Sequence, residues 1–251
     1  MRIAIITGAS AGLGQAFFAA VRRRCAGLDQ IWLIARRADR LAEMAADCPI
    51  PTVAVPLDLA SADAYQALAD KLAAEQPTVE LLINNAGLGA LGNMADSDIP
   101  TQIQMVDVNC RGLTAVTTAV LPYMTKGGTI INVASIAAFA PNARMAVYSS
   151  TKAFVLSLSG ALREELRDSG INVLAVCPGP MSTEFLDIAA ITGHSKTFER
   201  LPYCDPQQVA NRALDAALSG KAVYTNRLFF KFYRLLAKLL PRNLVMKLCK
   251  T

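Results

Sequence analysis

Two side chains that could transfer a proton lie four residues apart in the segment Tyr148-Ser149-Ser150-Thr151-Lys152. The segment has the pattern of a helix start, and residues four apart share one helix face, so both side chains are expected to point the same way. A free phenol has a pKa of about 10, which is too high for efficient proton transfer at neutral pH. A nearby ammonium favours the phenolate, so the pair predicts a tyrosine acid/base with a lowered pKa.

A Tyr/Lys pair alone is a weak signal, because most such pairs lie on protein surfaces without a function. Further polar or Gly/Pro clusters follow the apolar runs of the chain and strengthen it. They comprise Asn85, Ala86 and Gly87 after one run, Asn109 inside a long helical pattern, Ser135 thirteen residues before Tyr148, and Pro178, Gly179 and Thr183 after a later run.

A glycine-rich turn, Thr7-Gly8-Ala9-Ser10-Ala11-Gly12-Leu13-Gly14, follows the first apolar run and opens a helical pattern. Glycines there let backbone N–H groups approach a pyrophosphate, and the helix N-terminus favours negative charge. The context of strand, turn and helix predicts a dinucleotide site at Gly8, Ser10, Gly12, Leu13 and Gly14. A plain tight turn is the alternative.

The residues after the second apolar run indicate which dinucleotide binds. NAD sites commonly carry an acid there, but this chain has Ala35-Arg36-Arg37 and no acid before Asp39. A guanidinium can hold a 2′-phosphate with two parallel hydrogen bonds, whereas a carboxylate would repel it. The pair predicts NADP(H) over NAD(H), unless Arg36 and Arg37 are only solvated loop charges.

Short apolar runs alternate with helical patterns, which is typical of a parallel sheet buried on both faces. We predict a single doubly wound α/β domain of the Rossmann type, with six or seven parallel strands and helices on both faces. The carboxyl ends of the strands then share one edge, where ligands bind. The predicted strands are 3–7, 31–35, 52–56, 80–84, 128–134, 171–177 and 221–224, and the predicted helices begin near 13 and cover 40–46, 62–75, 102–123, 149–169, 206–218 and 228–240.

In this order and spacing, the motifs between residues 7 and 183 resemble those of the short-chain dehydrogenase/reductase family. The resemblance implies hydride transfer between NADP(H) and a carbonyl or alcohol. Tyr148 would exchange the proton, Ser135 would hydrogen-bond the substrate oxygen, Lys152 would bind the nicotinamide ribose, and Asn109 would hold a water that links Lys152 to solvent. Cofactor contacts are expected from Gly8, Ser10, Gly12, Leu13, Gly14, Arg36, Arg37, Asp58, Asn85, Ala86, Gly87, Tyr148, Lys152, Pro178, Gly179 and Thr183.

Composition excludes several classes of protein. The first 215 residues carry 17 basic and 20 acidic side chains, so the positive net charge gives no support for nucleic-acid binding by the body. Six cysteines without a Cys-x-x-Cys pair and a single histidine offer no zinc spacing, and we expect no metal. Buried reduced thiols and the lack of a signal peptide or a membrane span predict a cytoplasmic protein.

Residues 181–204 follow the Pro178-Gly179 turn and are expected to form a lid over the cleft. Their apolar side chains either contact a hydrophobic ketone or secondary alcohol, lipid or steroid-like, or only pack the lid shut. His194 is expected at the lid surface. The apolar residues are Met181, Phe185, Leu186, Ile188, Ile191, Phe198 and Leu201.

We expect a dinucleotide-binding domain over 1–225 and a basic amphipathic extension over 226–251. From Ala216 onward the chain has eight Lys or Arg and no acid, and Arg227, Lys231, Arg234 and Lys238 form a narrow stripe on a mostly apolar helix that Pro241 should end. This helix packs on the body or on a dimer mate, rims the substrate entrance, or contacts a membrane surface through residues 226–240.

A homodimer or homotetramer is expected, with a dimer as the simpler assembly. Two other functions remain open: a 3-oxoacyl reductase of fatty-acid metabolism, and a non-catalytic dinucleotide-binding sensor. The chain lacks the Gly-rich final strand with which reductases of 3-oxoacyl carrier-protein substrates usually end. A sensor has no need of the set Asn109, Ser135, Tyr148 and Lys152.

Overall fold

Seven parallel strands form one sheet in the computed structural model, which describes residues 1–46 and 48–248. The strand order is β3-β2-β1-β4-β5-β6-β7, so the direction of winding reverses between β1 and β4. The predicted single Rossmann-type domain is confirmed. The strands are β1 Arg2–Thr7, β2 Gln30–Ala35, β3 Thr52–Pro56, β4 Thr78–Asn84, β5 Met124–Val133, β6 Asn172–Val176 and β7 Val223–Tyr224.

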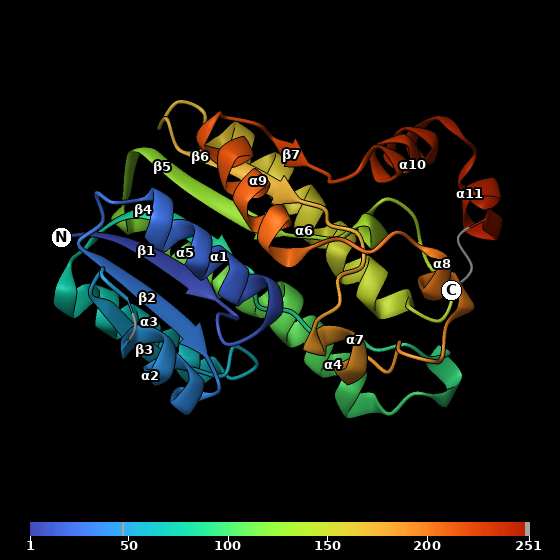
Figure 1. The fold of residues 1–251 in the computed structure, drawn as a ribbon, viewed down its shortest axis with the longest axis horizontal. Helices are drawn as coiled ribbons and strands as arrows, with labels where there is room; N and C mark the ends of the chain where they lie inside the picture. Colours follow the sequence, from blue (N-terminus) through green and yellow to red (C-terminus); the bar gives the residue numbers. More distant parts are fainter. Residues whose placement is uncertain (47, 249–251) are drawn as a thin grey trace.

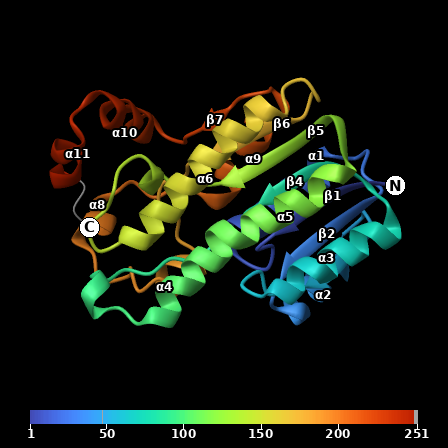
Figure 2. The same cartoon turned by 180° about the vertical axis from the view of Figure 1, so that it is seen from behind.

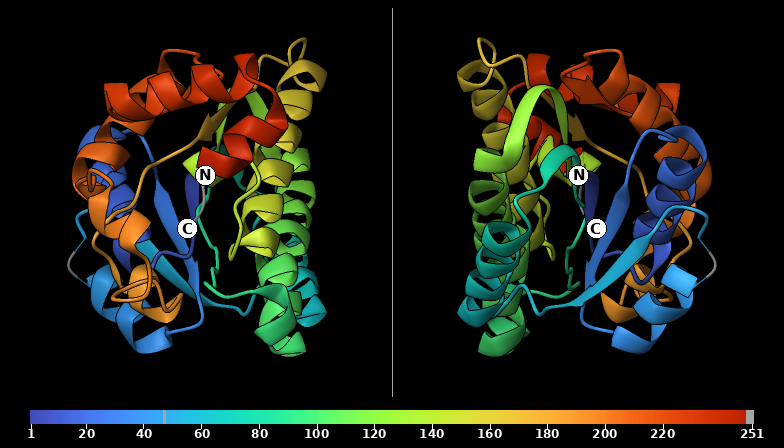
Figure 3. Two further views of the ribbon diagram at one scale, coloured as in Figure 1. Left: turned by 90° about the vertical axis from the view of Figure 1, so that its right-hand side faces the viewer. Right: turned by 90° about the vertical axis from the view of Figure 1, so that its left-hand side faces the viewer.

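Helices cover both faces of the sheet (Figures 1 and 2). One layer contains α1, Gly12–Arg24, α2, Ala38–Ala46, and α9, Pro206–Leu218. The other contains α3, Ala62–Glu75, α5, Leu113–Val120, and α6, Ala146–Glu165. Seen along the strands, the sheet stands between the two layers (Figure 3).

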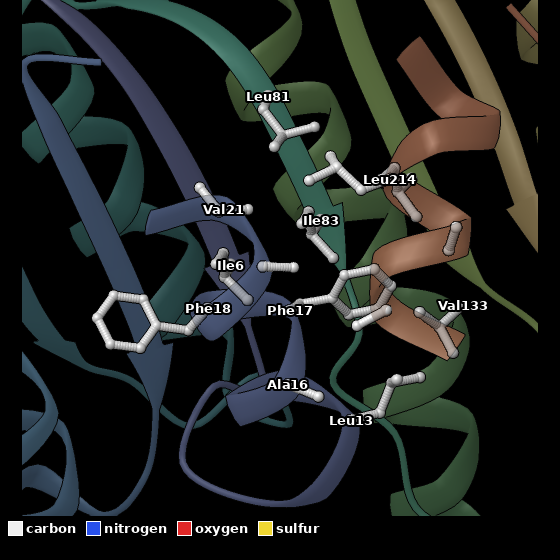
Figure 4. Packing of buried hydrophobic residues seen from close by; sticks show 14 of the residues in the cluster. Ile6, Leu13, Ala16, Phe17, Phe18, Val21, Leu81, Ile83, Val133 and Leu214 are labelled. Atoms are coloured by element: carbon white, nitrogen blue, oxygen red, sulfur yellow. The ribbon is translucent and has the colours of Figure 1, made fainter. Parts of the chain in front are cut away.

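The alternation of side chains along each strand explains the two layers. In β1, Ile6 packs into the core on the α1 side and its neighbour Ile5 into the core on the α3 side. Both are fully buried, which is why the run is apolar throughout and does not alternate with polar residues. On the α1 side, Phe17 points from its helix toward Leu214 of α9 and the sheet (Figure 4).

The structure corrects the predicted continuous helix over 102–123. This segment forms α4, Ile99–Val106, a π-helical turn over Asp107–Gly112, α5, and a short 3₁₀ turn over Leu121–Tyr123. Close packing accompanies the interruption, since a β carbon on Gly112 would lie 2.7 Å from the carbonyl oxygen of Leu59. π-Helical turns of this kind occur frequently at functional sites.

Two short helices, α7, Glu184–Ile188, and α8, Lys196–Arg200, lie in the segment 181–204. Beyond β7, the chain forms α10, Leu228–Leu239, and α11, Arg242–Leu248 (Figure 1). Cys249 and Lys250 lie outside the described residues. Among the described helices, none combines the length and the apolar composition that a bilayer crossing needs.

Candidate active site

A cavity of about 460 Å³ lies at the carboxyl edge of the sheet, within the range of small-molecule sites (roughly 300–1,000 Å³). The structure brings sixteen of the predicted site residues to it from six strand ends and the segments that follow. These are Gly8, Ser10, Gly12, Leu13, Arg36, Arg37, Asp58, Asn85, Ala86, Gly87, Ser135, Tyr148, Lys152, Pro178, Gly179 and Thr183. Gly14 and Asn109 do not line the cavity and lie behind residues that do.

The glycine-rich turn forms a cradle at one end of this cavity. Gly8 and Gly12 have φ angles of +62° and +52°, a region in which glycine is favoured. A β carbon on Gly14 would lie 2.1 Å from the Gly8 carbonyl oxygen, so α1 can begin directly against the turn only with glycine there. Asn85 Nδ2 holds the turn by donating to the Thr7 and Gly8 carbonyls, each at 3.1 Å. The open backbone beside a helix N-terminus fits the pyrophosphate of a dinucleotide.

Arg37 lies across this cradle. Its Nε donates to Ser10 Oγ at 3.2 Å and its second terminal nitrogen to the Ser10 carbonyl at 3.2 Å. The remaining nitrogen pairs at 2.8 Å with Glu184 of α7, which also accepts from Arg40 at 2.6 Å. The two guanidinium groups lower the pKa of the Glu184 carboxyl. Arg36 is exposed and lines the cavity at the same end.

Tyr148 is buried at the other end of the cavity, near the start of α6. We expected a nearby lysine to lower its pKa, but burial raises the pKa of Tyr148 to about 12, and its hydrogen bond with Ser135 only partly opposes that shift. Lys152 Nζ lies 5.8 Å from the centre of the tyrosine ring. The expected lowering is therefore wrong for the protein alone, since desolvation of the phenolate dominates.

Lys152 is buried, and its Nζ donates to the Val133 carbonyl at 2.9 Å. Burial lowers the pKa of its ammonium to about 8. Gly87 lies directly beside this group, because a β carbon there would be 3.2 Å from Nζ and 3.3 Å from Asn109 Oδ1. A side chain at position 87 would separate the lysine from the cavity.

Asn109 lies in the π-helical turn and is buried behind Gly87. Its amide exchanges two hydrogen bonds of 2.8 Å with the backbone N–H and carbonyl of Leu88, and it donates to Thr151 Oγ1 at 3.0 Å. Asn109 therefore connects the segment after β4 to α6, at the residue that precedes Lys152.

The turn after β6 forms the wall opposite the cradle. The Ile136 N–H donates to the Pro178 carbonyl at 3.1 Å, which ties this turn to the segment that carries Ser135. Thr183 approaches the cradle, since a β carbon on Gly12 would lie 3.1 Å from the Thr183 side chain. The backbone N–H of Cys204 donates to the Pro180 carbonyl at 2.8 Å, which holds the two ends of the segment 181–204 together.

The lid, residues 181–204, places apolar side chains over Tyr148. The Phe185 ring centre lies 5.7 Å from that of Tyr148. Of the seven apolar residues expected on the lid, Ile191 does not line the cavity; it is buried in a cluster that also contains Tyr148 and Leu186. The remaining six do line it: Met181, Phe185, Leu186, Ile188, Phe198 and Leu201. His194 is exposed.

The C-terminal helix α10 completes the wall. Phe230 is fully buried in the main core cluster, and Phe229 and Tyr233 line the cavity. Asn226, just before the helix, accepts a hydrogen bond of 3.1 Å from the Gly179 N–H. Of the placements left open by the sequence, the structure therefore shows packing on the body at the rim of the cavity. The division of the chain at residue 225 stays a prediction.

Sequence reasoning did not anticipate several residues around this site, among them Arg40, Glu184 and Asn226. Arg40 follows Arg37 by one helical turn and could have been found by that spacing. Glu184 and Asn226 carried no pattern of their own, because their contacts join segments more than forty residues apart. No group of three metal-ligating side chains occurs within the described residues.

Comparisons with known proteins agree with this geometry. The family model for short chain dehydrogenases matches residues 2–190. Sulfoacetaldehyde reductase 2 of Chromohalobacter salexigens is 38% identical over 73% of this chain and 74% of its own length. A probable NADP-dependent dehydrogenase of Haemophilus influenzae is 34% identical over 90% and 91%. A short-chain dehydrogenase from Sphingobium yanoikuyae, solved in complex with NADPH, superposes with a TM-score of 0.80 at 28% identity, covering 96% of this chain and 97% of that one.

Proposed function

Because the chain belongs to the short-chain dehydrogenase/reductase family and is an oxidoreductase, we propose that it moves a hydride between NADP(H) and a hydrophobic ketone or secondary alcohol. The observation that carries the proposal is the convergence of Ser135, Tyr148 and Lys152 on one apolar cavity that also contains the glycine cradle. A sensor that only binds a dinucleotide has no need of these three side chains.

Bound NADP(H) would supply or accept the hydride at its nicotinamide ring. The Tyr148 hydroxyl donates its proton to the carbonyl oxygen during reduction and takes a proton from the alcohol in the reverse direction. Its raised pKa keeps the hydroxyl protonated at neutral pH, which is the form that reduction requires. Ser135 hydrogen-bonds the same substrate oxygen and stabilises the charge that develops on it.

Lys152 would bind the cofactor, and Lys152 and Asn109 would together relay protons to the site. The Lys152 ammonium faces the cavity beside Gly87, where it can bind the nicotinamide ribose. Asn109 Oδ1 lies on the same side of Gly87 as Lys152 Nζ, and Asn109 would hold the water through which Lys152 exchanges protons with solvent. Its amide already binds Leu88 and Thr151, which leaves one acceptor site on Oδ1, the atom that lies close to Gly87, for such a water.

The preference for NADP(H) is supported by Arg36 and Arg37 at the end of β2, with Arg37 fixed against the cradle at Ser10. The relative from Haemophilus influenzae and the NADPH complex from Sphingobium yanoikuyae support it as well. Asp58 lies where the adenine would bind, and Asn85, Ala86 and Gly87 would lie beneath the cofactor. Pro178, Gly179 and Thr183 would contact the nicotinamide end.

The hydrophobic substrate is supported by the lining near Tyr148. Phe185, Leu186 and Phe198 of the lid pack in the same cluster as Tyr148. Phe229 and Tyr233 of α10 line the same cavity. Among the lid residues named as lining the cavity, the charged one is Glu184, and it pairs with Arg37 beside the cradle. A large apolar ketone therefore fits better than a small anionic aldehyde.

Exposed apolar residues on the neighbouring helices α4 and α6 support a homodimer or homotetramer. Ile99, Ile103 and Val106 lie on one face of α4 and are exposed, and Phe154 is exposed on α6, the helix that α4 contacts. An apolar row of this kind on neighbouring helices is typical of a subunit interface. Light scattering of Ile103→Glu should show a smaller assembly than the parent protein.

Steady-state kinetics test the proposal. We expect kcat/KM to be higher with NADPH than with NADH, and a panel of carbonyls should give higher values for bulky apolar ketones than for sulfoacetaldehyde. The double variant Arg36→Ala/Arg37→Ala should lose most of the preference for NADPH while turnover with NADH persists. A clear NADH preference in the parent protein would overturn the cofactor assignment, and a preference for the anionic aldehyde would overturn the substrate assignment.

A further inference from the structure

Helix α10 has two apolar faces, and the described part of the chain covers only one of them. On the inner face, Phe230 is fully buried. On the opposite side, four large apolar side chains lie within an arc of about 60° at roughly 100° per residue. Their exposed fractions are 82% for Leu228, 60% for Phe232, 52% for Leu235 and 71% for Leu239. Single exposed leucines are ordinary, but four on one short helix form an interaction surface.

Basic side chains border this outer face. Lys231 and Lys238 are exposed beside it and form no ion pair with any described residue, and Arg227 is exposed at the start of the helix. The chain contains no acid after Asp215. A second copy of the helix would bring the same positive border and no acidic residue to meet it. An anionic lipid surface matches both the apolar face and the charges beside it.

The outer face also lies next to the opening of the active-site cavity. Phe229 lines the cavity and is 57% exposed, so it lies at the mouth between the interior and the outer face. Tyr233, one turn further, lines the cavity from the inner face of the same helix. A surface that binds the outer face of α10 is therefore adjacent to the route into the cavity.

The candidate oligomer surface on α4 is separate from this one. In Figures 1 and 3, α10 and α4 lie on opposite sides of the carboxyl edge of the sheet. Assembly of subunits through α4 and α6 would therefore leave the outer face of α10 available.

We propose that α10 docks its outer face on an anionic lipid bilayer and that the hydrophobic substrate enters the cavity from that bilayer. The docking step depends only on the exposed residues and charges of α10. The entry step rests on the proposed function, because it requires a hydrophobic carbonyl or alcohol as substrate.

Sedimentation of the full chain with vesicles tests the docking step. Vesicles of phosphatidylcholine with phosphatidylglycerol should bind the protein more strongly than vesicles of phosphatidylcholine alone, and high salt should weaken binding. Leu235→Glu/Leu239→Glu should lower the partition coefficient at least about tenfold. Lys231→Glu/Lys238→Glu should lower it for anionic vesicles only.

Matched controls separate docking from general surface changes. Leu218→Glu places the same charge on a residue that is 60% exposed at the end of α9, and Lys126→Glu reverses an exposed lysine near the start of β5. Both should bind vesicles as the parent protein does. Equal binding of parent and Leu235→Glu/Leu239→Glu overturns docking. Loss of an oligomer in that variant, with no vesicle binding by the parent, also overturns it and assigns the face to contact between copies.

Turnover of an apolar ketone dissolved in vesicles tests the entry step. Anionic vesicles should raise kcat/KM for the parent protein and for Leu218→Glu, but not for Leu235→Glu/Leu239→Glu. All three proteins should reduce a water-soluble ketone at the same rate. Vesicle binding without any ketone turnover would reject the proposed function and leave docking in place, whereas turnover without binding would reject docking and entry and leave the proposed function in place. Vesicle binding that leaves the rate on the dissolved ketone unchanged overturns the entry step.

Discussion

The Phe230 ring occupies the space above Gly179, where a β carbon would lie 2.2 Å from ring atom Cε2. Gly179 belongs to the turn after β6, and Phe230 belongs to the C-terminal helix, so the two residues join the end of the chain to the wall of the active-site cavity. Asn226 reinforces this contact through its hydrogen bond with the Gly179 N–H. The position of α10 and the shape of this turn are therefore coupled.

Gly179→Ala should destabilise the protein by about 1–3 kcal/mol, because the added methyl group must displace the Phe230 ring. In a Phe230→Ala background, which carries its own cavity penalty, the same glycine substitution should have almost no effect. Urea unfolding of the four proteins measures the coupling. Additive effects of the two substitutions would show that the ring does not oppose the methyl group.

Tyr148→Phe should lower kcat for ketone reduction by about 10²–10⁴-fold, since the ring keeps its packing against Phe185 but loses the proton donor. The Kd for NADPH, followed by nicotinamide fluorescence, should stay close to that of the parent protein. Tyr123→Phe removes a hydroxyl outside the cavity and should leave both quantities unchanged. Near-normal kcat in Tyr148→Phe would reject the assignment.

Lys152→Met should stabilise the cofactor-free protein at pH 7. The pKa of Lys152 falls from 10.5 to about 8 on folding. Below pH 8 the folded protein must carry the ammonium in a desolvated site, which lowers its stability. This cost decreases as pH rises from 8 toward the unfolded value, because the folded protein has then released the proton. The free energy of unfolding should therefore exceed that of the parent protein by about 3 kcal/mol at pH 7, with a smaller gain near pH 10.

Denaturant unfolding of both proteins across this pH range provides the measurement. Lys126→Met, which removes an exposed ammonium, should change stability little at any pH. A difference between Lys152→Met and the parent protein that does not vary with pH would show that the lysine is not desolvated.

Glu184→Gln should tighten NADPH binding roughly two- to five-fold and leave NADH binding unchanged. The Glu184 carboxylate pairs with both Arg37 and Arg40, so it competes with a 2′-phosphate for the same guanidinium groups. Isothermal titration with both cofactors gives the comparison. Glu199→Gln alters another exposed lid carboxylate and should have no effect. Weaker NADPH binding in Glu184→Gln would mean that this carboxylate positions the arginines.

The succession of strands along the chain and the residues that follow each strand could be predicted from the sequence alone. These features depend on local patterns: the β-branched run Ile3–Ile6 predicts a buried strand, and Asp205 followed by Pro206 predicts the start of α9, where the Asp205 side chain does cap the helix. Once the strands are parallel, their carboxyl ends must share one edge, which is why Ser135, Tyr148 and Lys152 could be placed together.

The surroundings of these residues, by contrast, arise from contacts between distant segments of the folded chain. The pKa of Tyr148 is raised because distant segments exclude water from it, and Glu184 reaches Arg37 across 147 positions of sequence. The outer face of α10 is exposed because Phe230, rather than the leucines on the other side, fits against Gly179. Local pattern shows that a helix has apolar faces, but which face is buried depends on the surface that it meets.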